Sequence, residues 1–368
     1  MRETTSKVEM NKPKVSIVTI SYNQEQYIQQ TLDSFIDQKT DFNFEVIIAD
    51  DCSTDNTAGI IREYAEKFPN IIKPILRKKN IGIQSNFIDA LQHASGTYIA
   101  LCEGDDFWTD SLKLHKQVNF LETHKDYSLV FHPVRVFFEN HEEEDVTFPT
   151  IADSKQFTLK NLLKNNYIQT NSVMYRKVNY DNLLHNVMPF DWYLHLTHAR
   201  EGKIGFINEV MAAYRRHADG VWWETTHQAR DEIWKRHGAA HMLLYAELLK
   251  VYGDKVENRQ IIDEHIEGTV NILNRIDDAE KISLIGDFVK THPDLNAILM
   301  LSLSRITYKN YKQMDKDQEA LRQLKEELYK ANREIEKLKR EKENILNSKA
   351  YIVGDRLAQI SRIIRRIK

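Results

Sequence analysis

Three carboxylic acids follow directly on a short apolar segment. The apolar run at residues 97–102 has the length and residue types of a buried strand, and Glu103, Asp105 and Asp106 come next. Carboxylates at this spacing repel one another and raise each other's pKa, so such a cluster is tolerated mainly around a cation. Gly104 lacks a side chain, which lets backbone and metal approach closely. A cation site is the functional interpretation, and a polar loop after an edge strand is the alternative.

Three earlier strand-like segments, at 14–20, 44–49 and 72–77, also end in polar residues. Helix-like segments with short connections separate these strands, which predicts an α/β fold whose sheet is mainly parallel with right-handed crossovers. Ligands of such sheets bind outside the carboxyl ends of the strands. The polar residues expected at that edge, besides the three acids, are Tyr22, Asp50, Asp51, Arg77 and Asn80. Four strands that deliver polar residues to one edge indicate a nucleotide or a similar ligand.

These motifs, in this order, resemble the family 2 glycosyltransferases of bacterial polysaccharide and cell-surface glycan synthesis, which have a GT-A fold. The likeness covers roughly residues 13–220. It is carried by PKVSIVTISYN (13–23), EVIIADDCSTDNT (45–57), the turn at Asn80, SGTYIALCEGDDFW (95–108) and residues 188–222. A simple dinucleotide-binding fold is disfavoured because no G-x-G-x-x-G follows the first strand.

The resemblance implies that Asp105 coordinates a metal. Glu103 stands where the family more often has aspartate, so direct or water-mediated contact with the metal both stay open. Tyr22 is implied to pack on the nucleotide base, and Asp51, with Asp50, to accept hydrogen bonds from it. The remaining residues expected in the nucleotide and sugar site are Arg77, Asn80 and Asp106. Mn2+ or Mg2+ fits independently, since hard cations prefer carboxylate and diphosphate oxygens.

A second group of residues lies between 188 and 222. Asp191 opens an amphipathic helix, whose dipole favours the ionised carboxylate that a general base requires. The resemblance implies that Asp191 deprotonates the acceptor hydroxyl, and a plain helix N-cap is the alternative. Arg215, Arg216 and His217 are candidates to meet the diphosphate, and His217 is also a candidate metal ligand.

Composition sets the broad class of the protein. A chain of 368 residues exceeds one average domain, and its net charge of -3 gives no reason to expect nucleic acid as a partner. Two cysteines, Cys52 and Cys102, suit a reducing compartment. The first 14 residues lack the apolar core of a secretory signal. We therefore expect a cytoplasmic protein, with peripheral contact to the membrane as an option.

Five segments are expected along the chain. They are a flexible leader (1–12), a GT-A domain (13–222), a helical segment (223–313), a coiled coil (314–347) and a basic amphipathic tail (348–368). Within the GT-A domain, residues 128–138 are expected to form one strand, and the acidic run 141–155 a solvated loop.

The coiled coil is predicted from apolar residues at alternating three- and four-residue steps. These are Leu321, Leu324, Leu328, Ala331, Ile335, Leu338 and Ile345, with Lys342 as the interruption. Such a heptad pattern predicts a homo-oligomer, and a single solvated helix is the alternative. The tail alternates isoleucines with arginines, so it is expected to lie on an anionic bilayer or to pack on the protein.

Together these features predict an inverting, metal-dependent transferase. It would move a sugar from a nucleoside diphosphate donor, most simply a UDP-sugar, to a hydroxyl of a glycan or lipid-linked glycan. One alternative is a sugar-nucleotide pyrophosphorylase, although SYNQEQY stands where its glycine-rich, lysine-containing phosphate loop belongs. The other is a catalytically silent scaffold that assembles a complex through the coiled coil.

Overall fold

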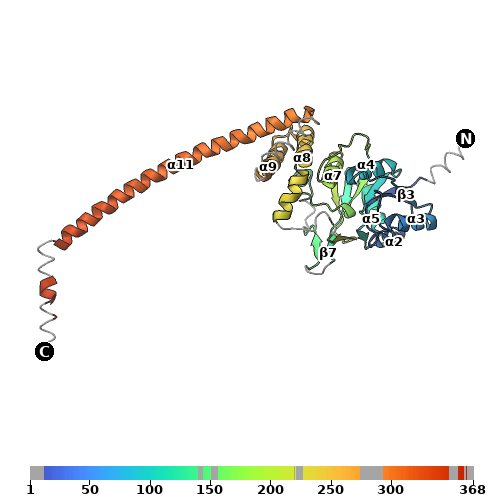
Figure 1. Cartoon of the computed structure of the whole chain (residues 1–368), viewed down its shortest axis with the longest axis horizontal. Helices are drawn as coiled ribbons and strands as arrows, with labels where there is room; N and C mark the ends of the chain where they lie inside the picture. The colour runs from blue at the N-terminus through green and yellow to red at the C-terminus, as the bar shows by residue number, and fades with distance from the viewer. Residues whose placement is uncertain are drawn as a thin grey trace. The chain divides into compact units, whose positions relative to one another are not determined.

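The fold was analysed in a computed structural model of the chain (Figure 1). It describes residues 12–139, 144–150, 156–218, 220, 227–273, 293–347, 355–359 and 362. The expected leader up to residue 11, parts of the acidic loop and most of the basic tail lie outside these residues. Contacts divide the chain into two compact units, Met1–Leu303 and Ser304–Lys368.

The first unit is built on a seven-stranded sheet with the strand order β10-β6-β9-β4-β1-β2-β3. The strands are β1 (Val15–Ser21), β2 (Phe44–Asp50), β3 (Ile72–Leu76), β4 (Tyr98–Leu101), β6 (Tyr127–Phe131), β9 (Met174–Arg176) and β10 (Lys203–Phe206). β4, β1, β2 and β3 are parallel neighbours, as the alternation of strands and helices predicts. Only β9 runs antiparallel to both of its neighbours in this sheet.

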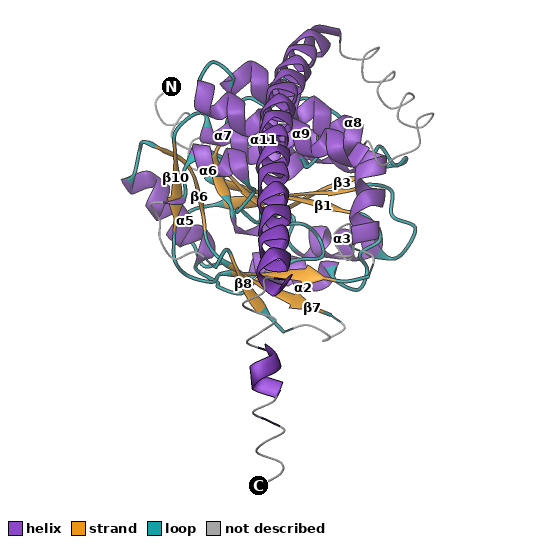
Figure 2. Ribbon diagram, turned by 90° about the vertical axis from the view of Figure 1, so that its left-hand side faces the viewer, coloured by secondary structure: helices purple, strands orange, loops and turns teal. Residues whose placement is uncertain are grey.

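Helices cover both faces of this sheet. They are α2 (Ile28–Ile36), α3 (Thr57–Lys67), α4 (Ile83–His93), α5 (Lys113–Thr123), α6 (Leu159–Lys164) and α7 (Phe190–Ala199). α4 and α7 lie on one face, and α2 and α3 lie on the other (Figures 1 and 2). Coverage from both sides explains why every residue of β1 is buried and why the strand is a continuous apolar and β-branched run. The expected α/β fold with a mainly parallel sheet is confirmed.

A second, four-stranded sheet has the order β5-β11-β7-β8. Its strands are β5 (Phe107–Trp108), β7 (Val134–Phe138), β8 (Val146–Phe148) and β11 (Ala212–Arg216). The loop expected at 141–155 is wrong for residues 146–148, which pair with β7 as strand β8. The single strand expected at 128–138 is wrong, because the chain leaves the first sheet after β6 and enters the second as β7. Pro133 lies at the break, where its missing N–H cannot contribute to a ladder. The second sheet brings β11 beside the acid-bearing segment at β5.

The rest of the described chain is helical. α8 (His227–Tyr252) packs against α9 (Val256–Leu273), and α9 packs against α6. The described residues of the second unit lie in α11 (Pro293–Asn347) and in a short helical stretch at 355–359 and 362. Among the described helices, none combines the length and the apolar character that crossing a bilayer requires. The five predicted segment boundaries remain predictions.

Candidate active site

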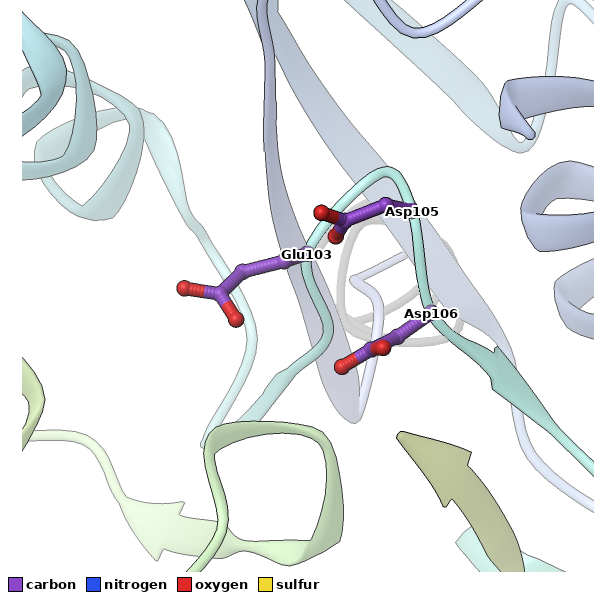
Figure 3. Close-up of side chains that lie close together, drawn as sticks. All are labelled: Glu103, Asp105 and Asp106. Carbon is purple, nitrogen blue, oxygen red and sulfur yellow. The ribbon is translucent and has the colours of Figure 1, made fainter. Parts of the chain in front are cut away.

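The three acids form one cluster in the loop between β4 and β5. Glu103, Asp105 and Asp106 each offer a carboxylate oxygen, and these oxygens lie within 4.8 Å of one another. Figure 3 shows the three side chains projecting to the same side of the loop. Their convergence agrees with the spacing seen in the sequence.

The loop that carries the three acids, residues 102–106 (the acid loop), is held in place by hydrogen bonds to α2 and β1. Thr31 Oγ1 lies 2.9 Å from the carbonyl oxygen of Gly104 and 2.6 Å from that of Asp106. The amide of Gly104 donates to the carbonyl of Ile20 at 3.1 Å. A Cβ at position 104 would lie 2.3 Å from Gln24 Oε1 and 3.1 Å from the Ile20 carbonyl oxygen, so glycine is required by close approach.

Burial and mutual repulsion destabilise the charged forms of two carboxylates in this cluster, Glu103 and Asp106. Asp106 is fully buried, and its Oδ1 accepts a hydrogen bond from the Arg215 amide at 2.8 Å, whereas no described residue donates to its Oδ2. Burial, reinforced by Asp105 and Glu103, raises the pKa of Asp106 well above its usual range. Burial, followed by the charges of Asp105 and Asp191, raises the pKa of Glu103 to about 8. These residues fit a hard divalent cation, because all of their candidate ligand atoms are carboxylate oxygens. A cation would also stabilise the charged form of the buried carboxylates, including the Asp106 oxygen that accepts no described hydrogen bond.

His217 lies directly beside the cluster. Its Nε2 is 3.1 Å from Asp105 Oδ2, and its ring packs against Tyr27 at 4.7 Å between centroids. Among the described residues, the group of side chains that could hold a metal consists of the three acids. His217 therefore contacts a candidate metal ligand, Asp105. Its own coordination of a metal stays a prediction.

The two arginines of β11 lie against aromatic rings of the neighbouring strand β7. The Arg215 guanidinium lies 4.7 Å from the Tyr27 ring and 4.9 Å from the Phe137 ring, and its Nε donates to the Asp105 carbonyl oxygen at 3.0 Å. Arg216 lies over the ring of Phe138 at 5.1 Å. Arg215 therefore supports the acid loop. Diphosphate contact by either arginine stays a prediction.

The other predicted nucleotide residues gather at the carboxyl ends of β1, β2 and β3. Tyr22 follows β1 and is 47% exposed, so its ring is available to stack on a ligand. Asp50 is buried and accepts hydrogen bonds from Ser53, at 2.5 Å to Oγ and 3.0 Å to the amide. Asp51 accepts from the amides of Ile81 and Gly82 at 2.8 and 2.9 Å. Both aspartates thus shape turns at this edge, whatever further contact they make with a nucleotide.

Arg77 and Asn80 belong to the same edge and are likewise tied to the protein. Arg77 donates to Asn86 Oδ1 at 2.6 Å and forms an ion pair with Asp89 at 2.5 Å. Asn80 Oδ1 accepts from the Gly82 amide at 3.0 Å. Their contact with a nucleotide stays a prediction.

Asp191 lies in the first turn of α7. Its charge is one of the causes of the raised pKa of Glu103, after burial and Asp105, so the two carboxylates interact electrostatically. Burial also raises the pKa of Asp191 itself, against the opposing hydrogen bonds from backbone amides and Asn166. Asn166 Nδ2 donates to Asp191 Oδ2 at 2.9 Å. The tertiary structure thus brings the candidate base within electrostatic reach of Glu103, 88 positions away in the sequence.

Sequence reasoning missed three residues that act on this site. Thr31 binds the acid loop, Asn166 binds Asp191, and Glu139 Oε2 accepts from the Tyr27 hydroxyl at 2.8 Å while Oε1 lies 3.7 Å from Arg215. Thr31 occupies a helix face whose other inward residues are apolar, a polar exception that periodicity alone could have flagged. Asn166 and Glu139 stand in loops or at a strand end, where no pattern marked them.

Comparison with known proteins identifies the family. The family model described as Glycosyl transferase family 2 matches residues 16–222, more than half of the chain. The chain belongs to this family. The glycosyltransferase expectation is thereby confirmed.

Relatives of this glycosyltransferase include proteins of several bacteria. An uncharacterized protein of Mycobacterium tuberculosis is 43% identical over 290 residues, which cover 78% of this chain and 82% of the relative. The UDP-Glc:alpha-D-GlcNAc-diphosphoundecaprenol beta-1,3-glucosyltransferase WfaP of Escherichia coli is 38% identical over 111 residues, 30% of this chain and 42% of that protein.

Among solved structures, TarS 1-349 of S. aureus in complex with UDP-GlcNAc shares the GT-A fold. It has a TM-score of 0.55 and 19% identity, and the match covers 82% of this chain and 92% of TarS 1-349. At that identity the likeness concerns the fold.

Proposed function

We propose that this glycosyltransferase is inverting and metal-dependent, and that it transfers a sugar from a nucleoside diphosphate donor to a hydroxyl of a glycan. The observation that carries the proposal is the electrostatic interaction of Asp191 with Glu103, which belongs to the cluster of Glu103, Asp105 and Asp106. Direct displacement needs a base and a cation site on either side of one reacting centre, and these residues supply candidates for both.

In this mechanism, Asp191 accepts the proton of the acceptor hydroxyl. The acceptor oxygen forms a bond to the anomeric carbon while the bond from that carbon to the diphosphate oxygen breaks on the opposite face. The diphosphate leaves with the electron pair, and the configuration inverts. A divalent cation held by Asp105 and its neighbours, Mn2+ or Mg2+, supplies electrostatic stabilisation of the departing diphosphate.

A UDP-sugar is the donor that we propose, with Tyr22 stacking on the base. The E. coli relative is named for UDP-Glc and a diphosphoundecaprenol-linked acceptor, and TarS was solved with UDP-GlcNAc. By analogy with these proteins, we propose a UDP-linked donor and a glycan or lipid-linked glycan acceptor for this chain. A donor that binds the folded state raises its melting temperature, so UDP with Mn2+ should do so.

Asp105→Asn tests the metal-binding half of the site. We expect Mn2+-dependent donor hydrolysis to fall about 100-fold, because the developing charge loses its electrostatic stabilisation. With a chelator present, the variant should melt at or above the wild-type temperature, since one of three repelling carboxylates is gone. Asp126→Asn, which alters an exposed ion pair with Lys203, is the matched control. Normal metal and donor binding by Asp105→Asn would falsify the assignment.

Asp191→Asn tests the proposed base separately. Glycan transfer should fall about 100-fold or more, while the melting-temperature rise with UDP and Mn2+ persists, because the amide cannot take the acceptor proton. Product stereochemistry, read by proton NMR of the anomeric centre, tests inversion. Retained configuration or wild-type transfer by Asp191→Asn contradicts the mechanism.

A further inference from the structure

The second unit carries an apolar stripe whose surroundings indicate a partner. Leu321, Leu324, Leu328, Ile335 and Leu338 follow the heptad positions a and d of α11, and each exposes 49 to 62% of its surface. A stripe of this kind on a long polar helix needs another helix to cover it. The charges beside the stripe distinguish between the ways in which a second helix can lie.

The positions that flank the stripe are segregated by charge. The g positions include Glu327, Glu334 and Glu341, whereas the e positions include Lys325 and Lys339. In coiled coils these flanking residues form the contacts between helices that set partner choice and orientation. One flank of the stripe is therefore acidic, and the charges on the other are those of the two lysines.

An antiparallel pair would join like flanks. With position 321 opposite 345, Glu327 would face Glu341 of the second copy, and Glu334 would face its own counterpart. On the other side, Lys325 would face Lys339. All of these contacts are repulsive.

A parallel, in-register pair joins unlike flanks. In this arrangement g positions meet e positions five residues further along, so Glu334 faces Lys339 of the second copy, twice by symmetry. Lys342, the polar residue at an a position, then lies next to Glu341 of the second copy. Within one chain, Lys339 Nζ contacts Glu336 at 2.7 Å, an exposed pair whose small free energy does not hold the side chain in place.

We infer that α11 binds a second copy of this chain as a parallel, in-register coiled coil. The occupant of the stripe is α11 of the second copy, and the segregated charges determine the direction. The arrangement joins two glycosyltransferase chains at their carboxyl-terminal helices, and it does not depend on the proposed reaction.

Disulfide trapping in the full-length chain tests the direction. Cys52→Ser leaves the buried Cys102 as the remaining native thiol, and Leu321→Cys is added near one end of the stripe. Parallel chains bring the two copies of residue 321 together, so mild oxidation should yield a covalent dimer on a non-reducing gel. The control Glu326→Cys lies at the outward f position and should yield much less. In an antiparallel pair, the two copies of residue 321 lie roughly 35 Å apart along the helix and cannot join.

Mixing the Leu321→Cys protein with an Ile345→Cys protein provides the opposite test. A predominant mixed disulfide between positions 321 and 345 overturns the parallel arrangement. A purely monomeric full-length chain in sedimentation equilibrium at micromolar concentration overturns self-association altogether.

Charge reversal supplies a readout without cysteine. Glu334→Lys places lysines opposite one another in the parallel pair, so the dissociation constant of the dimer should rise roughly tenfold. Adding Lys339→Glu restores opposite charges and should return the constant toward wild type. If the double variant dimerises no more tightly than Glu334→Lys alone, the parallel register is wrong.

Discussion

At the scale of single residues, the site combines groups that disfavour each other without a ligand. Asp106 keeps one buried carboxylate oxygen without a described donor, and Glu103 has its pKa raised to about 8. A bound cation would stabilise the charged forms of Asp106 and Glu103, because each carboxylate would gain an opposite charge nearby. The residues that hold the cluster in position are correspondingly polar and buried, as Thr31 is.

Asn166 positions the proposed base, and its removal should change the pH profile. Its hydrogen bond lowers the pKa of Asp191 against the larger effect of burial, which raises it. In Asn166→Ala the pKa of Asp191 rises further, so the acid limb of the transfer rate moves to higher pH. At neutral pH the rate should fall about tenfold, the scale of one lost hydrogen bond to a charged group.

The measurement is the transfer rate at saturating donor between pH 5 and 9 (roughly the range in which buried carboxylates and histidines titrate). Asn165→Ala, at the neighbouring residue, is the control and should leave the acid limb in place. An unchanged limb in Asn166→Ala means that Asn166 does not govern the protonation of Asp191.

At the scale of elements, the conformation of the acid loop depends on hydrogen bonds with α2, β1 and β11, which surround it. Thr31 holds it from α2, Ile20 from β1, and the Arg215 amide from β11. The loop therefore owes its geometry to three segments that are far apart in the sequence.

Gly104→Ala should disturb that fit. The new Cβ would lie 3.1 Å from the Ile20 carbonyl oxygen and even closer to Gln24, so the loop must shift. We expect a loss of about 1–3 kcal/mol in the free energy of unfolding. Mn2+ affinity, measured by titration calorimetry, should fall about tenfold as the carboxylates separate.

The matched control is Gly268→Ala in α9, where an added Cβ meets nothing within 4 Å. Because alanine is the better helix former, this variant should be as stable as wild type or slightly more stable. Wild-type metal affinity in Gly104→Ala would show that the loop tolerates displacement.

At the scale of the whole molecule, folding buries a lysine in the core of the first unit. Lys113 is fully buried, its Nζ donates to Gln117 Oε1 at 2.8 Å, and the face of Trp108 lies 4.0 Å away. The ring favours the charged amine, but burial outweighs it and lowers the pKa of Lys113 from 10.5 to about 7. The unfolded chain therefore binds more protons than the native chain between these two pH values.

The free energy of unfolding should consequently rise with pH in that interval. The expected contribution of Lys113 is on the order of 1 kcal/mol per pH unit. Lys113→Met lacks this contribution, so its advantage over wild type should be largest below pH 7 and should shrink as pH rises. Urea unfolding at a series of pH values measures both curves, with the exposed Lys39→Met as control. Parallel curves for wild type and Lys113→Met would contradict a buried, neutral lysine.

Local sequence patterns were sufficient to predict the main sheet and the place of the site. Apolar runs that end in polar residues identified β1 to β4, and the crossover rule for parallel strands put Tyr22, Asp51 and the acids at one edge. They failed at residues 128–138, because strand propensity does not report which of two sheets a strand joins. Only Pro133 marked the break there.

The sequence by itself determined the family, the alternation of strands and helices that predicts a parallel sheet, and the clustering of three acids, because each depends on motifs within short segments of the chain. Only the tertiary structure decided what surrounds those acids. The hydrogen bond from Asn166 to Asp191 and the electrostatic interaction of Asp191 with Glu103 join separate loops and helices. The enclosure of Arg215 by Tyr27 and Phe137 depends on packing between elements. No periodicity encodes such contacts, since they arise when surfaces distant in sequence are buried against each other.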